Sequence, residues 1–251
     1  MREAHASVPF RLVSLLGGKS RNAIPRDATA VVSIEAGREP ELRAAIEGSA
    51  ATIRDAFSKT DAGVDVSVGV AEAAADPWTG AATTVLLDAI ALVPTGPLAI
   101  SPDFDGLVET STSIGEAVTD GATLALHSLT RSSNASALPE VLAALDAAAR
   151  LAGGSLELGQ ADPGWRPNLD SPALDLSRRV YERLFGQPPV VTAVHAWLET
   201  AVIGDRLPGL DMISFGPQIE GPHSPDERIS IPTVERFWEL LAGVADEFSA
   251  V

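Results

Sequence analysis

Hydrophobic and polar residues alternate in the first part of the chain in a pattern that predicts a strand–strand–helix–strand unit. Dense apolar runs at Phe10–Leu16 and Ala28–Ile34 predict two strands joined by a turn rich in Gly and Asn. Apolar residues at helical spacing predict a helix over Glu39–Phe57. Strict alternation over Val64–Val70 then predicts a strand with one buried face. A second helix is expected at about Trp78–Leu92.

The same order of elements follows in the next stretch of sequence. Two strands, a helix and a short strand are predicted at Leu107–Ile114, Ala122–Leu129, Ser136–Leu151 and Ser155–Leu158. The helix is the clearest of these because its apolar residues form one stripe and a Gly-Gly pair follows it. Two such units predict a ferredoxin-like (split βαβ) layer, in which helices cover one face of an antiparallel sheet.

The pattern changes after Ala161–Asn168, where two prolines and a glycine mark a domain boundary. Beyond it we predict helices at Ser171–Phe185 and Ile231–Phe248 and strands at Pro189–Val194 and Leu210–Phe215. Alternating helices and strands indicate an α/β sheet, but two strands make only part of one. We therefore expect the last third to be loosely packed or self-associating, since a strand edge and the apolar face of the last helix stay exposed.

Composition narrows the classes of function. With 18 Lys and Arg against 34 Asp and Glu, the 251-residue chain has a formal net charge of −16, which disfavours nucleic acids and anionic membranes as partners. The absence of cysteine leaves His, Asp and Glu as metal ligands. No apolar run is long enough for a membrane helix and no secretory signal is visible, so we expect a cytoplasmic protein.

The sequence has four histidines, of which His223 stands out. His5 lies near the terminus and His127 within an apolar strand, where ordinary structural roles are expected. His223 lies in a loop with prolines on both sides, which fix the backbone beside the imidazole. Asp226 and Glu227 are close enough in sequence to accept a proton from its second ring nitrogen, as carboxylates do for metal-bound histidines. A proline-rich turn also forms without a metal, so both interpretations stay open.

Four further positions are candidates with ordinary alternatives. His195 and Glu199 are four residues apart, which on a helix would place them on one face. They could be a base with its orienting group, two metal ligands or a surface hydrogen bond. Arg131, at a strand end, could bind a carboxylate in a forked geometry or simply be solvated. Asn22 could bind a ligand through its amide or merely form a turn.

Several stretches combine glycine, proline, tryptophan and histidine in unusual strings. They are Gly17–Arg26, Gly106–Ser111, Arg131–Ser133, Pro163–Pro167, His195–Glu199, Asp211–Pro217 and Gly221–Glu227. Taken together and in this order, they resemble the Xaa-His dipeptidases (aminoacyl-histidine dipeptidases), which are dinuclear zinc peptidases related to carnosinase and the aminoacylases. The resemblance extends along nearly the whole chain, but it corresponds to the C-terminal half of the family only.

The resemblance implies an architecture and a set of roles. Residues 1–165 would form the ferredoxin-like lid, which is dimerisation-like, and residues 166–251 the C-terminal segment of the zinc-binding α/β catalytic domain. His223 matches a zinc ligand, with Asp226 and Glu227 beside it. Arg131 and Asn22 match lid positions suited to the carboxylate and the backbone of a dipeptide. The segment from His195 to Glu199 would line the substrate pocket.

The resemblance also implies what this chain lacks. The family hydrolyses dipeptides with a C-terminal His by a zinc-bound hydroxide at a site with two zinc ions, but its other ligands and its general base have no counterpart here. Trp197 also replaces a family glycine. The isolated chain is then an inactive, truncated half, completed by a separately encoded N-terminal half, or an incomplete reading frame. The alternative is a non-catalytic lid module that forms a homodimer or binds small molecules.

Overall fold

The computed structural model describes residues 1–72, 75–222 and 226–249 and divides the chain into two units. The N-terminal unit contains Met1–Ile100, Val108–Ser132 and Ser136–Gly159, and the C-terminal unit contains Ser101–Leu107, Ser133–Ala135 and Gln160–Val251. The units are defined by compactness, so the functional assignment of 1–165 and 166–251 stays a prediction. In the part of the chain that the structure describes, no helix is both long and apolar enough to cross a membrane.

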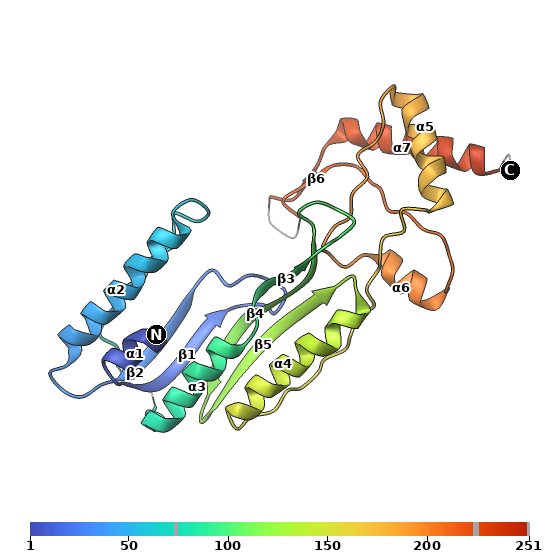
Figure 1. Ribbon diagram of the computed structural model, residues 1–251. Helices are drawn as coiled ribbons and strands as arrows, with labels where there is room; N and C mark the ends of the chain where they lie inside the picture. Colours follow the sequence, from blue (N-terminus) through green and yellow to red (C-terminus); the bar gives the residue numbers. More distant parts are fainter. Residues whose placement is uncertain (73–74, 223–225, 250–251) are drawn as a thin grey trace. The chain divides into compact units, whose positions relative to one another are not determined.

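The N-terminal unit is built on a five-stranded sheet around the long strand β4 (Val108–Asp120). One edge of β4 pairs along its length with β5 (Thr123–Ser132). The other edge pairs with β3 (Gly96–Ile100) near the start of β4 and with β1 (Arg11–Gly18) near its end, and β1 pairs with β2 (Ala28–Ser33). All pairs are antiparallel (Figure 1), which confirms the predicted class of sheet.

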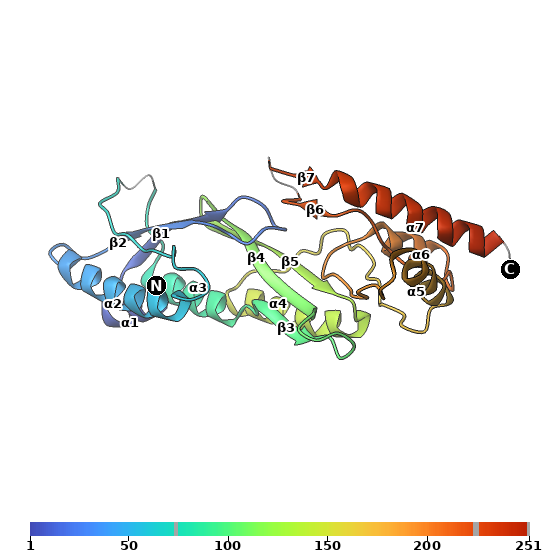
Figure 2. The same cartoon turned by 90° about the horizontal axis from the view of Figure 1, so that it is seen from above.

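Helices α3 (Gly80–Leu92) and α4 (Leu138–Leu151) contact each other and lie along one face of this sheet (Figure 2). A 3-10 turn at Ala135–Ala137 precedes α4. The short helix α1 (Arg2–Ser7), which the sequence pattern did not predict, contacts α3 and α2 (Glu39–Phe57). The core joins these elements to the start of β1 through a set of buried apolar residues: Ala4, Val8, Phe10, Leu42 and Leu87.

A buried threonine fastens α3 to β1. The Thr83 hydroxyl accepts a hydrogen bond from the Leu12 N–H at 3.0 Å and donates one to the Thr79 carbonyl at 3.0 Å. The Trp78 N–H donates to the Leu12 carbonyl at 2.8 Å, so both polar backbone groups of Leu12 bond to the start of α3. Thr79 in turn caps α3 by accepting from the Ala82 N–H. The first turn of α3 is therefore both capped locally and attached to the distant strand β1.

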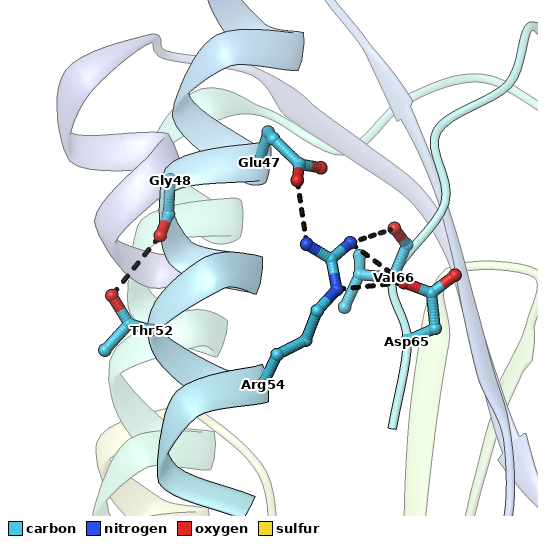
Figure 3. A network of polar contacts seen from close by, with 6 residues as sticks. All are labelled: Glu47, Gly48, Thr52, Arg54, Asp65 and Val66. Atoms are coloured by element: carbon cyan, nitrogen blue, oxygen red, sulfur yellow. Dashed lines mark hydrogen bonds and ion pairs between the residues drawn. The ribbon is translucent and has the colours of Figure 1, made fainter. Parts of the chain in front are cut away.

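The prediction of a strand at Val64–Val70 is wrong, because side chains of α2 bind the backbone of this segment. Arg43 donates to the Val68 carbonyl at 2.6 Å, and Arg54 donates to the Val66 carbonyl at 3.5 Å. Arg54 also bridges Asp65 and Glu47 at 2.8 Å each (Figure 3). These arginines hold the segment along the helix, where it has no strand ladder. Period-two alternation was therefore a misleading signal in this segment.

One other predicted strand in the N-terminal unit is absent, and one observed strand was not predicted. Ser155–Leu158 is not a strand, because it follows two glycines and leaves Leu158 67% exposed, without an apolar face to bury. The sequence pattern missed β3, which contains Pro97. Proline is tolerated because β3 ends the strand order and an edge strand does not need every N–H. The predicted order of strand, strand, helix and strand therefore fails at the closing strand of each of the two units.

The C-terminal unit contains helices α5 (Pro172–Phe185), α6 (Glu199–Arg206) and α7 (Ile231–Ser249) and a two-stranded ladder of β6 (Ile219–Glu220) and β7 (Arg228–Ile229). Helices α5 and α7 form at the positions that their apolar periodicity predicts. Helix α5 begins where the buried Ser171 side chain accepts from the Leu174 N–H, and it ends at Gly186 with a φ of 73°.

The strands predicted at Pro189–Val194 and Leu210–Phe215 are absent from the structure. Adjacent prolines 188 and 189 remove two backbone donors from the first segment. The second begins in a turn, where the Leu210 N–H donates to the Leu207 carbonyl. A strand needs a neighbouring strand to satisfy its backbone, and neither segment has one among the described residues. The C-terminal unit therefore contains less β-sheet than the predicted α/β segment.

We expect Thr83→Val to lower the free energy of unfolding of the chain by about 1–3 kcal/mol, because the buried Leu12 N–H loses its acceptor. Urea titration of the purified chain measures this change. Thr52→Val is the matched control, since Thr52 is an exposed helical threonine that donates to the Gly48 carbonyl; a change within about 0.5 kcal/mol is expected. Equal losses for both variants would contradict the role of Thr83.

The Arg54 side chain lowers the pKa of the Asp65 carboxyl below its ordinary value, through its hydrogen bonds first and its charge to a lesser degree. A lowered pKa stabilises the fold above the ordinary carboxyl pKa, and this contribution is lost as the pH falls through the folded-state pKa. Arg54→Gln should raise the pKa of Asp65 toward its ordinary value in an NMR titration. Arg43→Gln, which breaks a neighbouring α2 contact, should leave it unchanged.

Candidate functional site

Arg131 lies near the end of β5, directly opposite Ser111 of β4. The two flanking pairs are hydroxyl pairs, in which Thr110 bonds Ser132 and Thr112 bonds Thr130, each at 2.8 Å. Thr110 and Thr112 are buried, with 2% and 1% of their surface exposed. Because side chains alternate across a strand, Arg131 lies on the opposite face from these buried hydroxyls. The stretches Gly106–Ser111 and Arg131–Ser133, recognised separately in the sequence, therefore meet on neighbouring strands.

The register that places Arg131 opposite Ser111 is set by a bulge. From the turn, Asp120 pairs with Thr123, and Glu116 pairs with His127 in the same register. Between Ile114 and Glu116 the register shifts by one residue, at Gly115. Without this shift Arg131 would pair with the next residue of β4, and a threonine that is now buried would share its face.

Asn22 lies in the exposed segment between β1 and β2, which is held against β4 by two glycines. Gly18 has a φ of +68°, and a Cβ atom there would lie 1.9 Å from the Gly115 carbonyl oxygen. A Cβ atom on Gly115 would lie 2.5 Å from the Ser20 carbonyl oxygen. The Ser20 hydroxyl donates to the Asn22 amide oxygen at 2.5 Å, so the amide N–H groups are the donors Asn22 can offer a ligand.

Asn22 and Arg131 therefore belong to the same unit and are positioned by the same strand. Ser111, the partner of Arg131, is four residues from Gly115, which corresponds to about 13 Å along β4. The sequence analysis did not identify Gly115 as part of the arrangement, because its bulge interrupts the register that the turn after Asp120 would set.

His195 and Glu199 lie in the C-terminal unit, in segments of different secondary structure. Helix α6 begins at Glu199, while Leu198 is extended with a φ of −129° and His195 is a half-buried residue in the preceding bend. The two side chains therefore do not share a helical face. The expectation from their spacing assumed that both lie on one helix, and this assumption is wrong. Trp197, between them, is 47% exposed.

His223 lies outside the described residues, so its proposed role as a ligand stays a prediction. The ladder that flanks it is described: Ile219 pairs with Ile229, and Glu220 pairs with Arg228. The Arg228 Nε donates to the Glu220 carboxylate at 2.8 Å across this ladder. Asp226 and Glu227, both exposed, immediately precede β7. The proline-rich segment therefore begins and ends on a short hairpin stem, which the sequence analysis missed.

A surface groove in the C-terminal unit brings together two stretches that the sequence analysis recognised separately. Its lining includes Trp165, Arg166, Asp205, Asp211 and Met212. The Asp211 carboxylate accepts a hydrogen bond from the Ala173 N–H at 2.7 Å, in the first turn of α5, so it satisfies a helix N-terminus. Asp211 is therefore a structural residue, whereas Arg166 and Asp205 add charged groups to the groove.

The described residues do not contain a group of side chains that corresponds to the metal site implied by the resemblance. Among residues 1–72, 75–222 and 226–249, no group of three or more His, Asp or Glu side chains is arranged to hold a metal ion. A catalytic zinc normally takes three protein ligands.

Known proteins match the chain over nearly its whole length, although no family model does. Cytosol non-specific dipeptidase from Escherichia coli (strain K12) is 33% identical over 244 residues, which make up 96% of this chain and 50% of that protein. The crystal structure of aminoacylhistidine dipeptidase from Vibrio alginolyticus matches 97% of this chain and 50% of that chain, with a TM-score of 0.85 and 32% identity. The chain thus spans about half the length of these relatives, and the resemblance seen in the motifs is confirmed.

We expect Gly115→Ala to displace the segment that carries Asn22, because the new methyl group would overlap the Ser20 carbonyl. The expected loss is about 1–3 kcal/mol of unfolding free energy, the usual cost of overpacking. Hydrogen exchange of residues 19–27 should also become faster. Gly69→Ala is the control, because a Cβ atom there meets nothing within 4 Å. Unchanged exchange in Gly115→Ala would contradict the proposed anchoring.

Proposed function

We propose that this chain, a homologue of one half of the aminoacylhistidine and cytosol non-specific dipeptidases, supplies the substrate-binding lid and the C-terminal segment of the catalytic domain of a dipeptidase. The observation that carries the proposal is the structural match over 97% of the chain, at 32% identity. The substrates we propose are dipeptides with a C-terminal histidine, such as carnosine-like compounds. The protein would act in the cytoplasm.

The N-terminal unit would bind the dipeptide. Arg131 lies at one end of the β4–β5 ladder, and its guanidinium suits the terminal carboxylate, to which it can donate two parallel hydrogen bonds. The Asn22 amide N–H groups would donate to a carbonyl of the dipeptide backbone. These contacts orient the scissile bond and would contribute chiefly to substrate affinity and positioning.

The C-terminal unit would contribute the remaining contacts. In this proposal His195 and Glu199 line the pocket, and Trp197 narrows it where the family has glycine. His223 would be one zinc ligand, with Asp226 and Glu227 orienting its ring. Zinc would polarise the peptide carbonyl and activate water for hydrolysis. The other ligands and the general base would come from a polypeptide equivalent to the unmatched half of the relatives, so this chain alone should be inactive.

A covalent chimera tests the proposal without relying on association. The matched half of the E. coli dipeptidase is replaced by this chain, and hydrolysis of β-alanyl-histidine is assayed with zinc. We expect turnover by the chimera and none by the isolated chain. Arg131→Met in the chimera should raise KM by roughly 10–100-fold, because charge-assisted hydrogen bonds are lost. Arg150→Met, at an exposed arginine of α4 paired with Asp146, should change KM less than about twofold.

Two outcomes would contradict the proposal. One is a folded, zinc-loaded chimera without dipeptidase activity, which would favour a non-catalytic lid that binds small molecules. The other is a similar KM for the Arg131 and Arg150 variants. NMR titration of the isolated chain with β-alanyl-histidine provides a second measurement, in which the Arg131 side-chain signals should shift and those of Arg150 should not.

A further inference from the structure

Helix α7 has one broad apolar face, and α5 packs against one side of it. Leu240 is buried in the contact, and a Cβ atom on Gly243 would lie 2.9 Å from the Val180 side chain. Arg183 of α5 pairs with Glu247 of α7 at 2.7 Å (Figure 2 shows the two helices). These residues of α7 are three to four positions apart and define the face toward α5.

The side of this apolar face that lies away from α5 is exposed. Val234, Trp238, Leu241 and Phe248 follow one another at helical spacing and lie on one side of α7. Their exposed fractions are 39%, 66%, 39% and 75%, respectively. We call these four residues the α7 stripe. It extends about 21 Å along the helix, at 1.5 Å per residue. An apolar face that extends beyond the contact with α5 is typical of a helix that packs against a further neighbour.

The rest of the C-terminal unit offers little to cover this stripe. Its buried apolar residues among those described are Val180, Ala201 and Leu240. The structural relative suggests what does cover it. The matched region includes 97% of this chain, so the unmatched 3% is too short to contain α7, and the match takes up half of that relative. The relative therefore contains a second stretch of polypeptide, as long as this chain, that can pack on the equivalent helix.

A second copy of this chain is a less suitable partner. Glu235, Glu239 and Asp246 lie along one side of the α7 stripe, and the chain has a formal net charge of −16. Two copies meeting stripe to stripe would bring these carboxylates together, and like charges at an interface oppose association. A different polypeptide has no such restriction.

We infer that the α7 stripe is the docking surface for a polypeptide equivalent to the half of the dipeptidases that this chain does not match. The inference rests on the proposed function for the identity of the partner, but it does not require catalysis. Trp238 is its central anchor, since large aromatic residues in the middle of an interface carry most of the binding free energy.

Co-expression tests the inference. The full chain is produced together with a tagged fragment of the E. coli dipeptidase that comprises its unmatched half, and the complex is weighed by light scattering. We expect a 1:1 complex. Trp238→Arg should weaken it by at least roughly 30-fold, while Glu239→Arg, the same new residue on the adjacent charged side, should retain it. Because Trp238 is exposed in the isolated chain, Trp238→Arg should leave the thermal midpoint of that chain nearly unchanged.

Three results would overturn the inference. They are the absence of a complex with the unsubstituted chain, equal binding by Trp238→Arg and the unsubstituted chain, and a homodimer of the chain that Trp238→Arg converts to a monomer. The outcome is separable from that of the proposed function. A 1:1 complex that depends on Trp238 but hydrolyses no dipeptide would contradict the proposed function alone. An active covalent chimera that tolerates arginine at position 238 without loss of stability would contradict this inference alone.

Discussion

The close contact between the backbones of Gly18 and Gly115 is the constraint on which the candidate site in the N-terminal unit depends. A side chain at either position would overlap backbone atoms, so β1 can end against β4 only with glycine at both places. The bulge at Gly115 also sets the register of β4 with β5. One backbone arrangement therefore fixes the segment that carries Asn22 and the face on which Arg131 lies.

The two units differ in how completely they bury their apolar residues. In the N-terminal unit, helices cover one face of the sheet, and α1, α2, α3 and β1 share a core. In the C-terminal unit, α7 packs on α5 with one side of its apolar face and exposes the other. The unit that carries Asn22 and Arg131 is thus organised by its own contacts. The C-terminal unit, which contains the segments on both sides of His223, has an apolar surface that suits a further polypeptide. This agrees with the length of the relatives, which is twice that of this chain.

The residues of the candidate site were predictable as motifs, but their geometry was not. Arg131 and the stretch ending at Ser111 were recognised as separate strings, and the structure pairs them. Counting from the turn at Asp120 would have assigned Arg131 a partner one position away, because the bulge is invisible to strand periodicity. The spacing of His195 and Glu199 suggested a shared helical face, whereas the extended Leu198 starts the helix too late for it.

The sequence by itself determined the main helices, since helical hydrogen bonds and the 3.6-residue period are local properties of a segment such as Glu39–Phe57. It also indicated the resemblance to dipeptidases, through short strings of unusual residues. Only the tertiary structure decided which extended segments became strands, because a strand forms when a distant neighbour accepts its backbone groups. Val64–Val70 alternates as a strand should, yet Arg43 and Arg54 of α2 bind its carbonyls.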